Sequence, residues 1–215
     1  DLQIDGFTLA DIDSDGDFDL FIFFRRDHSL AWLENAEETQ EWIFHEVYSP
    51  LYEYKASVSS DFDGNGLADI AVASREDGLM IIYQSEVDVW TLSSIGRHFY
   101  NGRDLEVYDL NADGKEDIIG ISWVPSYISW WESPGSDDSE WSEYRIVELD
   151  NNCNSIIIND IDGNGVPEIL AYNTSDESGF SFVTVGNDSS GSSHDMIYES
   201  WVETPNCEYH YHYRN

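Results

Sequence analysis

Short apolar runs rich in strand-forming residues recur along the chain, and no stretch keeps a helical period with caps. Four of these runs, LFIFF, IAVAS, IIGIS and ILAY, begin at Leu20, Ile70, Ile118 and Ile169. Because they lack polar alternation, we expect strands that are covered on both faces. A second strand-like segment precedes each run (FTLADI, ASVSSDF, LEVYDL and SIIINDI), so the sequence predicts four β-hairpins.

Two further strand-like segments follow each of the first three hairpins. They are LAWLEN and WIFHEVY, MIIYQS and VWTLSSI, and ISWWES and SEYRIVEL, and the last repeat has FSFVTV and DMIYESWV. Four strands per repeat of about fifty residues are typical of a propeller blade. The sequence therefore predicts an all-β fold, a β-propeller of four four-stranded blades over residues 1–51, 52–100, 101–150 and 151–204, with a C-terminal strand or tail over 205–215.

One nine-residue pattern connects the two strands of every predicted hairpin. It reads Asp-x-Asp/Asn-x-Asp/Asn-Gly-x-x-Asp/Glu and occurs at residues 11–19, 61–69, 109–117 and 160–168, with starts separated by 50, 48 and 51 residues. Glycine at position 6 permits a sharp turn that a residue with a Cβ resists. The pattern predicts one acidic loop between strands 1 and 2 of each blade.

The residue types in this loop are those that bind Ca²⁺, because oxygen ligands at positions 1, 3, 5 and 9 and a carbonyl at position 7 can surround one large hard cation. The predicted side-chain ligands are Asp11, Asp13, Asp15 and Asp19; Asp61, Asp63, Asn65 and Asp69; Asp109, Asn111, Asp113 and Asp117; and Asp160, Asp162, Asn164 and Glu168. The predicted carbonyl ligands are those of Asp17, Leu67, Lys115 and Val166. We expect about four calcium ions.

Three other interpretations fit the loops less well. An EF-hand needs a bidentate Glu at position 12, which here is Ile22, Val72, Gly120 and Ala171. Magnesium keeps more of its waters and demands a stricter octahedron than such a loop offers. Asp, Asn and Gly are also common in hairpin turns that bind no metal. Four copies in phase favour the calcium interpretation.

The charge of the chain restricts its partners. There are 44 acidic and 9 basic residues, a formal net charge of -35, which repels nucleic acid and anionic membranes. The aromatic content of 14% is too high for a disordered acidic tail. No run of eighteen apolar residues predicts membrane insertion. Four calcium ions would bring the charge to about -27, so we expect the metal-free chain to be marginally stable.

Location and covalent features are less constrained. The chain begins at Asp1 without a signal-peptide pattern, from which we expect a processed piece of a precursor and an extracellular or cell-surface location. Cys153 and Cys207 form one disulfide or remain two buried thiols. Asn173 and Asn187 fit the N-glycosylation pattern.

The loop with its apolar second strand, and the Trp-x-Glu-Asn-like third strand at 32–35 and 131–133, resemble the FG-GAP and VCBS repeat family. The Phe-Gly and Gly-Ala-Pro signatures of integrin repeats are absent, so the VCBS-like branch is more similar. The resemblance implies structural calcium in the loops and ligand binding by loops on a propeller face.

No nucleophile elbow, HExxH motif or phosphate loop is present, and we expect no enzyme, although sequence alone leaves a glycosidase-type carboxylate pair open. The favoured function is a non-catalytic adhesion or recognition module for a protein or glycan ligand. Trp123, Trp130, Trp131 and Trp141 are either stacking surfaces or core residues. The alternatives are a subunit of a secreted filament or surface coat and a non-catalytic part of a larger secreted enzyme.

The sequence leaves the assembly of the blades open. The four blades form a closed ring, which we favour, or a fragment of a larger propeller, or a unit that pairs with other copies of itself. In the tail, Tyr209, Tyr211 and Tyr213 alternate with His210 and His212, which predicts a strand that joins a blade or seals the ring. A transition-metal site at the two histidines is the less favoured interpretation.

Overall fold

The computed structural model describes residues 3–24, 29–36, 41–47, 53–136, 140–149, 153–161, 163, 165–172, 180–184, 198–203 and 208–212, the last three ranges as backbone. All the regular secondary structure in these ranges is β-strand, so the all-β prediction is confirmed. No helix in these ranges is long and apolar enough to cross a membrane.

The strands form four antiparallel sheets in chain order. The first sheet contains β1 (Ile4–Ala10), β2 (Asp19–Phe24), β3 (Leu30–Ala36) and β4 (Glu41–Val47). The second contains β5 (Tyr54–Ser60), β6 (Asp69–Ser74), β7 (Gly78–Glu86) and β8 (Val89–Gly96). The third contains β9 (Gly102–Tyr108), β10 (Asp117–Trp123), β11 (Ser126–Glu132) and β12 (Ser142–Glu148). The fourth contains β13 (Ser155–Asn159), β14 (Glu168–Tyr172), β15 (Phe180–Thr184), β16 (Tyr198–Glu203) and β17 (Glu208–His212).

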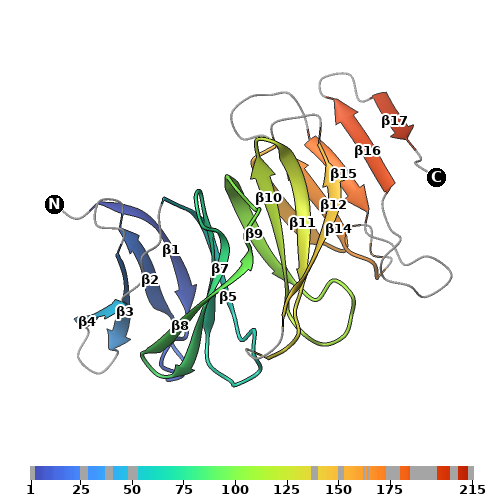
Figure 1. Cartoon of the computed structure of the whole chain (residues 1–215). Helices are drawn as coiled ribbons and strands as arrows, with labels where there is room; N and C mark the ends of the chain where they lie inside the picture. Colours follow the sequence, from blue (N-terminus) through green and yellow to red (C-terminus); the bar gives the residue numbers. More distant parts are fainter. Residues whose placement is uncertain are drawn as a thin grey trace.

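The sheets stand side by side in a row, with β1, β5, β9 and β13 as successive neighbours (Figure 1). Within each of these strands, side chains alternate between two faces. We call the face toward the preceding sheet the leading face and the face toward the following sheet the trailing face. In the second and third sheets, the second strands β6 and β10 are almost wholly apolar because both of their faces meet a neighbouring sheet.

Three hydrophobic clusters fill the spaces between successive sheets. Phe21 and Trp32 on the trailing face of the first sheet pack with Ile70 on the leading face of the second. Ile81 and Leu105 lie in the cluster between the second and third sheets. A third cluster joins the third and fourth sheets and contains the buried Cys153. The core of the protein is therefore divided into layers between sheets.

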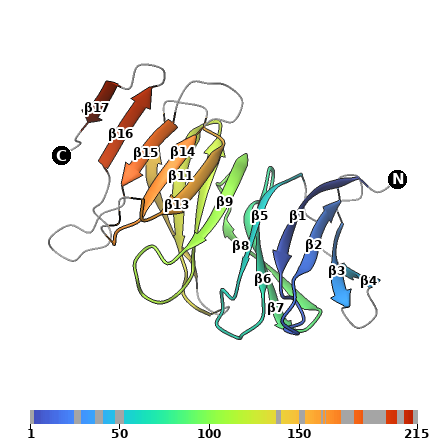
Figure 2. The ribbon, with the colours of Figure 1, turned by 180° about the vertical axis from the view of Figure 1, so that it is seen from behind.

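The row is open, and the closed ring of four blades that the sequence favoured is not formed. The first and fourth sheets lie at opposite ends of the molecule in both views (Figures 1 and 2). The tail contributes β17, which pairs with β16 as a fifth strand of the last sheet rather than reaching the first one.

Candidate functional site

The four acidic loops lie at one edge of the row, where each connects the first and second strands of its sheet. In the first hairpin, Ala10 pairs with Asp19, so residues 11–18 form the connection. The pairs Ser60–Asp69, Tyr108–Asp117 and Asn159–Glu168 close the other three loops in the same register. We call this edge the loop edge. The prediction of one loop per hairpin is confirmed.

Side-chain oxygens organise the loops through the same hydrogen bonds in successive repeats. In the second loop, Asp63 accepts the N–H of Asn65 at 3.0 Å, and the Asn65 side chain accepts the N–H of Leu67 at 2.7 Å. The position 1 carboxylate, Asp61, accepts the N–H groups of Asn65 and Gly66 at 3.0 and 2.9 Å. Equivalent bonds recur in the first, third and fourth loops. These turns fix the backbone at position 7, where a carbonyl ligand was predicted.

Two positions of each loop have left-handed backbones, whereas the sequence indicated only one. Position 6 is glycine in every copy, with φ between 85° and 99°. Position 4 is also left-handed, at Gly64 and Gly163 but also at Ser14 and Ala112, which have φ of 62° and 57°. Residues with a Cβ are strained in this left-handed region. At Ser14 and Ala112 the hydrogen bonds of the loop therefore impose the backbone conformation.

The position 9 carboxylate has a structural task that the sequence analysis missed. Asp69 is fully buried and accepts the N–H of Phe62 at 2.9 Å and the N–H of Gln84, in the third strand, at 2.8 Å. Asp19 and Asp117 make the same pair of bonds. This carboxylate therefore ties the loop to the third strand of its sheet. The sequence feature that could have indicated this role is an acidic residue at the start of a strand that is otherwise apolar.

Crowding and burial make these carboxylates costly without a cation. Burial raises the pKa of Asp69 to about 7, and the charges of Asp63 and Asp61 act in the same direction against its two amide hydrogen bonds. Burial likewise raises the pKa of Asp117 to about 6. Burial, followed by the charges of Asp19 and Asp15, raises the pKa of Asp13. A bound cation would remove this cost.

The structure brings together predicted ligands in two of the loops. One oxygen from each of Asp11, Asp13 and Asp15 lies within 4.8 Å of the others, and the same holds for Asp61, Asp63 and Asp69. Oδ1 of Asp11 is buried without a hydrogen-bond partner, as is Oδ1 of Asp160 in the fourth loop. Because a buried carboxylate oxygen needs a partner, this donor set fits a hard cation.

The third and fourth loops differ from the first two. In the third loop, the Lys115 ammonium lies 3.4 Å from Asp113 Oδ2, and the Asn111 amide donates to Glu132 at 2.9 Å. A lysine thus already supplies positive charge near that loop. In the fourth loop, Asp162 and Asn164 lie outside the described residues, and Glu168 accepts the N–H of Ile161 at 2.8 Å.

The four tryptophans proposed as stacking surfaces have different environments. Trp130 and Trp131 are buried between sheets, and Trp141 is half-buried with its Nε1–H donating to the Tyr83 hydroxyl at 2.8 Å. Trp123 is 39% exposed at the edge of the row opposite the loops. We call this opposite edge, which carries the β10–β11 turn and the connection 97–101, the turn edge.

Aromatic and cationic residues gather at the turn edge, in the β10–β11 turn, at the start of β9 and in the connection 97–101. We call them the recognition surface: Arg97, Tyr100, Arg103, Trp123 and Val124. The Arg103 guanidinium stacks over the Trp123 ring at 4.2 Å, and Tyr100 and Val124 are exposed. The Trp123 N–H donates to the Asn101 carbonyl at 3.2 Å. These contacts hold the turn against the neighbouring connection.

The two arginines of the recognition surface are unexpected in so acidic a chain. Among the described residues, neither Arg97 nor Arg103 has a carboxylate within ion-pair distance, whereas Arg75 pairs with Glu53 at 2.9 Å. Nε of Arg103 is buried without a hydrogen-bond partner. Unneutralised guanidinium groups beside an exposed aromatic ring can receive an acidic ligand that also stacks.

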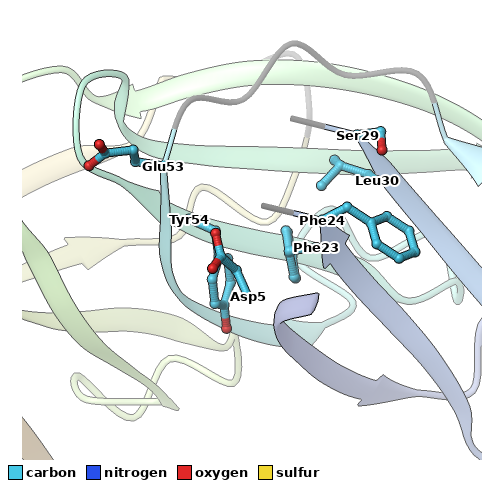
Figure 3. A pocket seen from close by; sticks show the side chains of 7 residues that line it. All are labelled: Asp5, Phe23, Phe24, Ser29, Leu30, Glu53 and Tyr54. Atoms are coloured by element: carbon cyan, nitrogen blue, oxygen red, sulfur yellow. The ribbon is translucent and has the colours of Figure 1, made fainter. Parts of the chain in front are cut away.

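A small pocket lies between the first and second sheets (Figure 3), lined by Asp5, Phe23, Phe24, Ser29, Leu30, Glu53 and Tyr54. Glu53 is paired with Arg75, and the Tyr54 hydroxyl lies 3.2 Å from Ser57 Oγ. The Tyr54 ring stacks on Phe23 at 4.2 Å. These groups serve packing between the sheets, so this pocket is not the favoured site.

Several predictions concern residues outside the described set. Cys207, Asn173 and Asn187 are not described, so the disulfide and the glycosylation sites stay predictions. His210 and His212 lie in β17, of which the structure describes the backbone.

Comparisons with known proteins agree with the repeat architecture. The FG-GAP-like repeat matches residues 61–120 and again residues 109–171, together just over half of the chain. No curated protein matches the sequence. Among solved structures, the chain is similar to a lectin of Agrocybe aegerita, described for its specific recognition of non-reducing terminal N-acetylglucosamine. The similarity has a TM-score of 0.60 at 15% identity and covers 89% of this chain but 50% of the lectin chain.

Proposed function

The chain belongs to the FG-GAP-like repeat family, and from this premise we propose that it is a non-catalytic, extracellular glycan-recognition module of the β-propeller type whose acidic loops hold calcium. The observation that carries the glycan assignment is the recognition surface, an exposed tryptophan stacked by Arg103 with Arg97 at the same edge, both arginines without an ion pair among the described residues. The similarity to a lectin supports the same assignment.

The ligand that fits this surface is a saccharide with an acidic group. The exposed part of the Trp123 ring offers an apolar platform for the C–H face of a sugar. Arg97 and Arg103 would bind a carboxylate or sulfate through charge-assisted hydrogen bonds. An anionic ligand would otherwise be repelled by a chain of net charge -35, so this cationic edge is the place for it.

Calcium is proposed as a structural cofactor of the loop edge. In the first loop, Asp11, Asp13 and Asp15 would hold the ion, and in the second loop Asp61, Asp63 and Asp69 would do so. The ion would neutralise crowded carboxylates and stabilise the hairpins. No catalytic step is assigned to it.

A titration of acidic and neutral oligosaccharides into the protein tests the glycan proposal. We expect the acidic ligands to bind the wild-type chain, and Trp123→Ala to weaken binding at least tenfold, about 1.4 kcal/mol. Trp123→Phe should retain part of the affinity, because it keeps an aromatic face. Phe18→Ala is the matched control, because it removes an exposed aromatic ring at the loop edge, and this variant should bind normally. Equal affinity in Trp123→Ala would refute the assignment of this surface.

A further inference from the structure

The leading face of the first sheet is apolar, and no described residue of another sheet covers it. Phe7 and Leu9 in β1 are 60% and 55% exposed. The equivalent residues of the third sheet, Leu105 and Val107, pack against the second sheet. Beside Phe7 and Leu9, a separate hydrophobic cluster of β2 and β3 residues, including Ile22 and Phe24, also belongs to the first sheet alone. This face has the chemistry of an interface between sheets.

A tryptophan repeated at the start of the fourth strand, in β4 and β8 and directly before β12, strengthens this interpretation. Trp42, Trp90 and Trp141 lie 31, 29 and 32 residues after the first Asp of their loops. Trp90 packs edge-on against Phe21 of the preceding sheet at 5.5 Å, and Trp141 packs against Phe62 at 5.7 Å. Trp42 occupies the same position in the first sheet and is 51% exposed.

The trailing side of the fourth sheet shows the complementary half of this contact. Loop position 2 is buried beneath the next sheet at Ile12 and Phe62 but 50% exposed at Ile161. Ile157 in β13 is exposed as well. Among the described residues, one half of the repeated interface is therefore exposed on the first sheet, at Phe7, Leu9 and Trp42. The other half is exposed on the fourth sheet, at Ile157 and Ile161.

A polar contact repeats with the apolar ones. The Gln84 amide donates to the Ile12 carbonyl of the preceding loop at 3.1 Å, and the Ser133 hydroxyl donates to the Phe62 carbonyl at 3.3 Å. Asn35 is the equivalent of Gln84 and Ser133 in the first sheet, because the backbone N–H of each donates to the position 9 carboxylate of its own sheet. Its amide is thus placed to donate to an Ile161 carbonyl.

We propose that two copies of the chain associate head to tail, the leading face of each first sheet packing on the fourth sheet of the other. In each of the two identical contacts, Trp42 and Asn35 of one copy meet Ile161 of the other, as Trp141 and Ser133 meet Phe62 within the chain. A heterologous contact of this kind closes into a ring when the rotation permits. Two open rows of four sheets make eight, within the four to eight blades typical of propellers.

The solution mass of the whole chain in calcium and 0.15 M salt tests this inference, by light scattering across a range of concentrations. We expect twice 24.6 kDa for the wild-type chain. Trp42→Ser and Ile161→Ser should each reduce the mass to one copy, with unchanged far-ultraviolet circular dichroism, because both side chains are exposed in the single chain. Trp123→Ala, altered at the turn edge, should remain at two copies.

Mixing the two single-copy variants distinguishes head-to-tail association from other arrangements. Trp42→Ser keeps an intact fourth sheet and Ile161→Ser keeps an intact leading face, so an equimolar mixture should partly recover the double mass. Three results would each overturn the two-copy ring. They are a single mass for the wild-type chain at about 100 µM, a double mass that persists in both variants, and masses that grow beyond two copies. Glycan binding to Trp123 is measured separately, so its failure would leave this result unaffected.

Discussion

Replacing Asp13 by Asn should raise the stability of the metal-free protein but reduce the stabilisation that calcium adds. Asp13 shares the first loop with Asp11 and Asp15, one oxygen of each lying within 4.8 Å of the others. Its Oδ1 accepts the N–H of Asp15 at 3.2 Å, and an Asn side chain retains that acceptor. The substitution therefore removes a charge while preserving the turn.

The magnitude follows from the geometry. Two unit charges 4.8 Å apart in water repel each other by about 0.9 kcal/mol, and physiological salt reduces this to about half. Asp13→Asn removes two such pairs, so the metal-free fold should gain about 1 kcal/mol. For a chain of this length, that raises the melting temperature by about 2–4 °C.

In calcium, the same variant should lose binding energy. At a free concentration one hundred times the dissociation constant, one site contributes about 2.7 kcal/mol to folding. Losing one of three carboxylate ligands should weaken binding at least tenfold, which reduces that contribution to about 1.4 kcal/mol. The calcium-induced rise in melting temperature should therefore shrink by about 3–5 °C.

The assay is a pair of thermal melts for each variant, in millimolar calcium and in chelator, with the difference between them as the result. Glu41→Gln, at an exposed position of β4, is the control for loss of one charge outside the loops. It should change the free energy of unfolding by no more than about 0.5 kcal/mol in either condition. A calcium increment that stays the same in Asp13→Asn would show that Asp13 binds no calcium. A melting temperature that falls in chelator would refute the argument from repulsion between the carboxylates.

Two further substitutions probe the interfaces between the sheets. Trp141→Phe should lower stability by about 1–2 kcal/mol, since it removes the hydrogen bond to the Tyr83 hydroxyl and part of the packing on Phe62; denaturant titration measures this. Glu106→Gln should raise the melting temperature at pH 7 more than at pH 4.5. Burial, and then the charge of Asp104, raises the pKa of Glu106 in the folded protein. The wild-type fold therefore loses stability as the pH rises from the pKa of Glu106 in the unfolded chain to its higher pKa in the folded protein. Parallel pH profiles of the two proteins would contradict this.

The sequence predicted the strands well because the second and third sheets are covered on both faces and the first and fourth on one. The run Ile118–Ile121 is apolar at every position, since Ile118 packs against the second sheet and Ile119 against the fourth. The acidic motif located the hairpin connections because its position 9 residue begins the second strand. Periodicity and local chemistry were sufficient for both.

The arrangement of the sheets was not predictable in the same way. Whether four sheets close depends on the angle between neighbours, which is set by the volumes of side chains such as Trp131 and Phe99 in the layers between them. A repeat pattern does not contain that angle. The uncovered leading face does have a sequence signal, because Trp42 repeats a position at which Trp90 and Trp141 contact a preceding sheet. The left-handed backbones of Ser14 and Ala112 have no such signal in those residues themselves.

The acidic loops and the recognition surface lie at opposite edges of the row, so calcium should influence ligand binding through folding alone. The strand β9 separates them, with Arg103 near one end and Tyr108, next to the third loop, at the other. Its seven residues span about 20 Å, more than twice the screening length of about 8 Å at physiological salt. Well below the melting temperature in chelator, the affinity for an acidic saccharide should therefore be the same with and without calcium. A protein that keeps its circular dichroism in chelator but loses the ligand would place a calcium ion at the recognition surface instead.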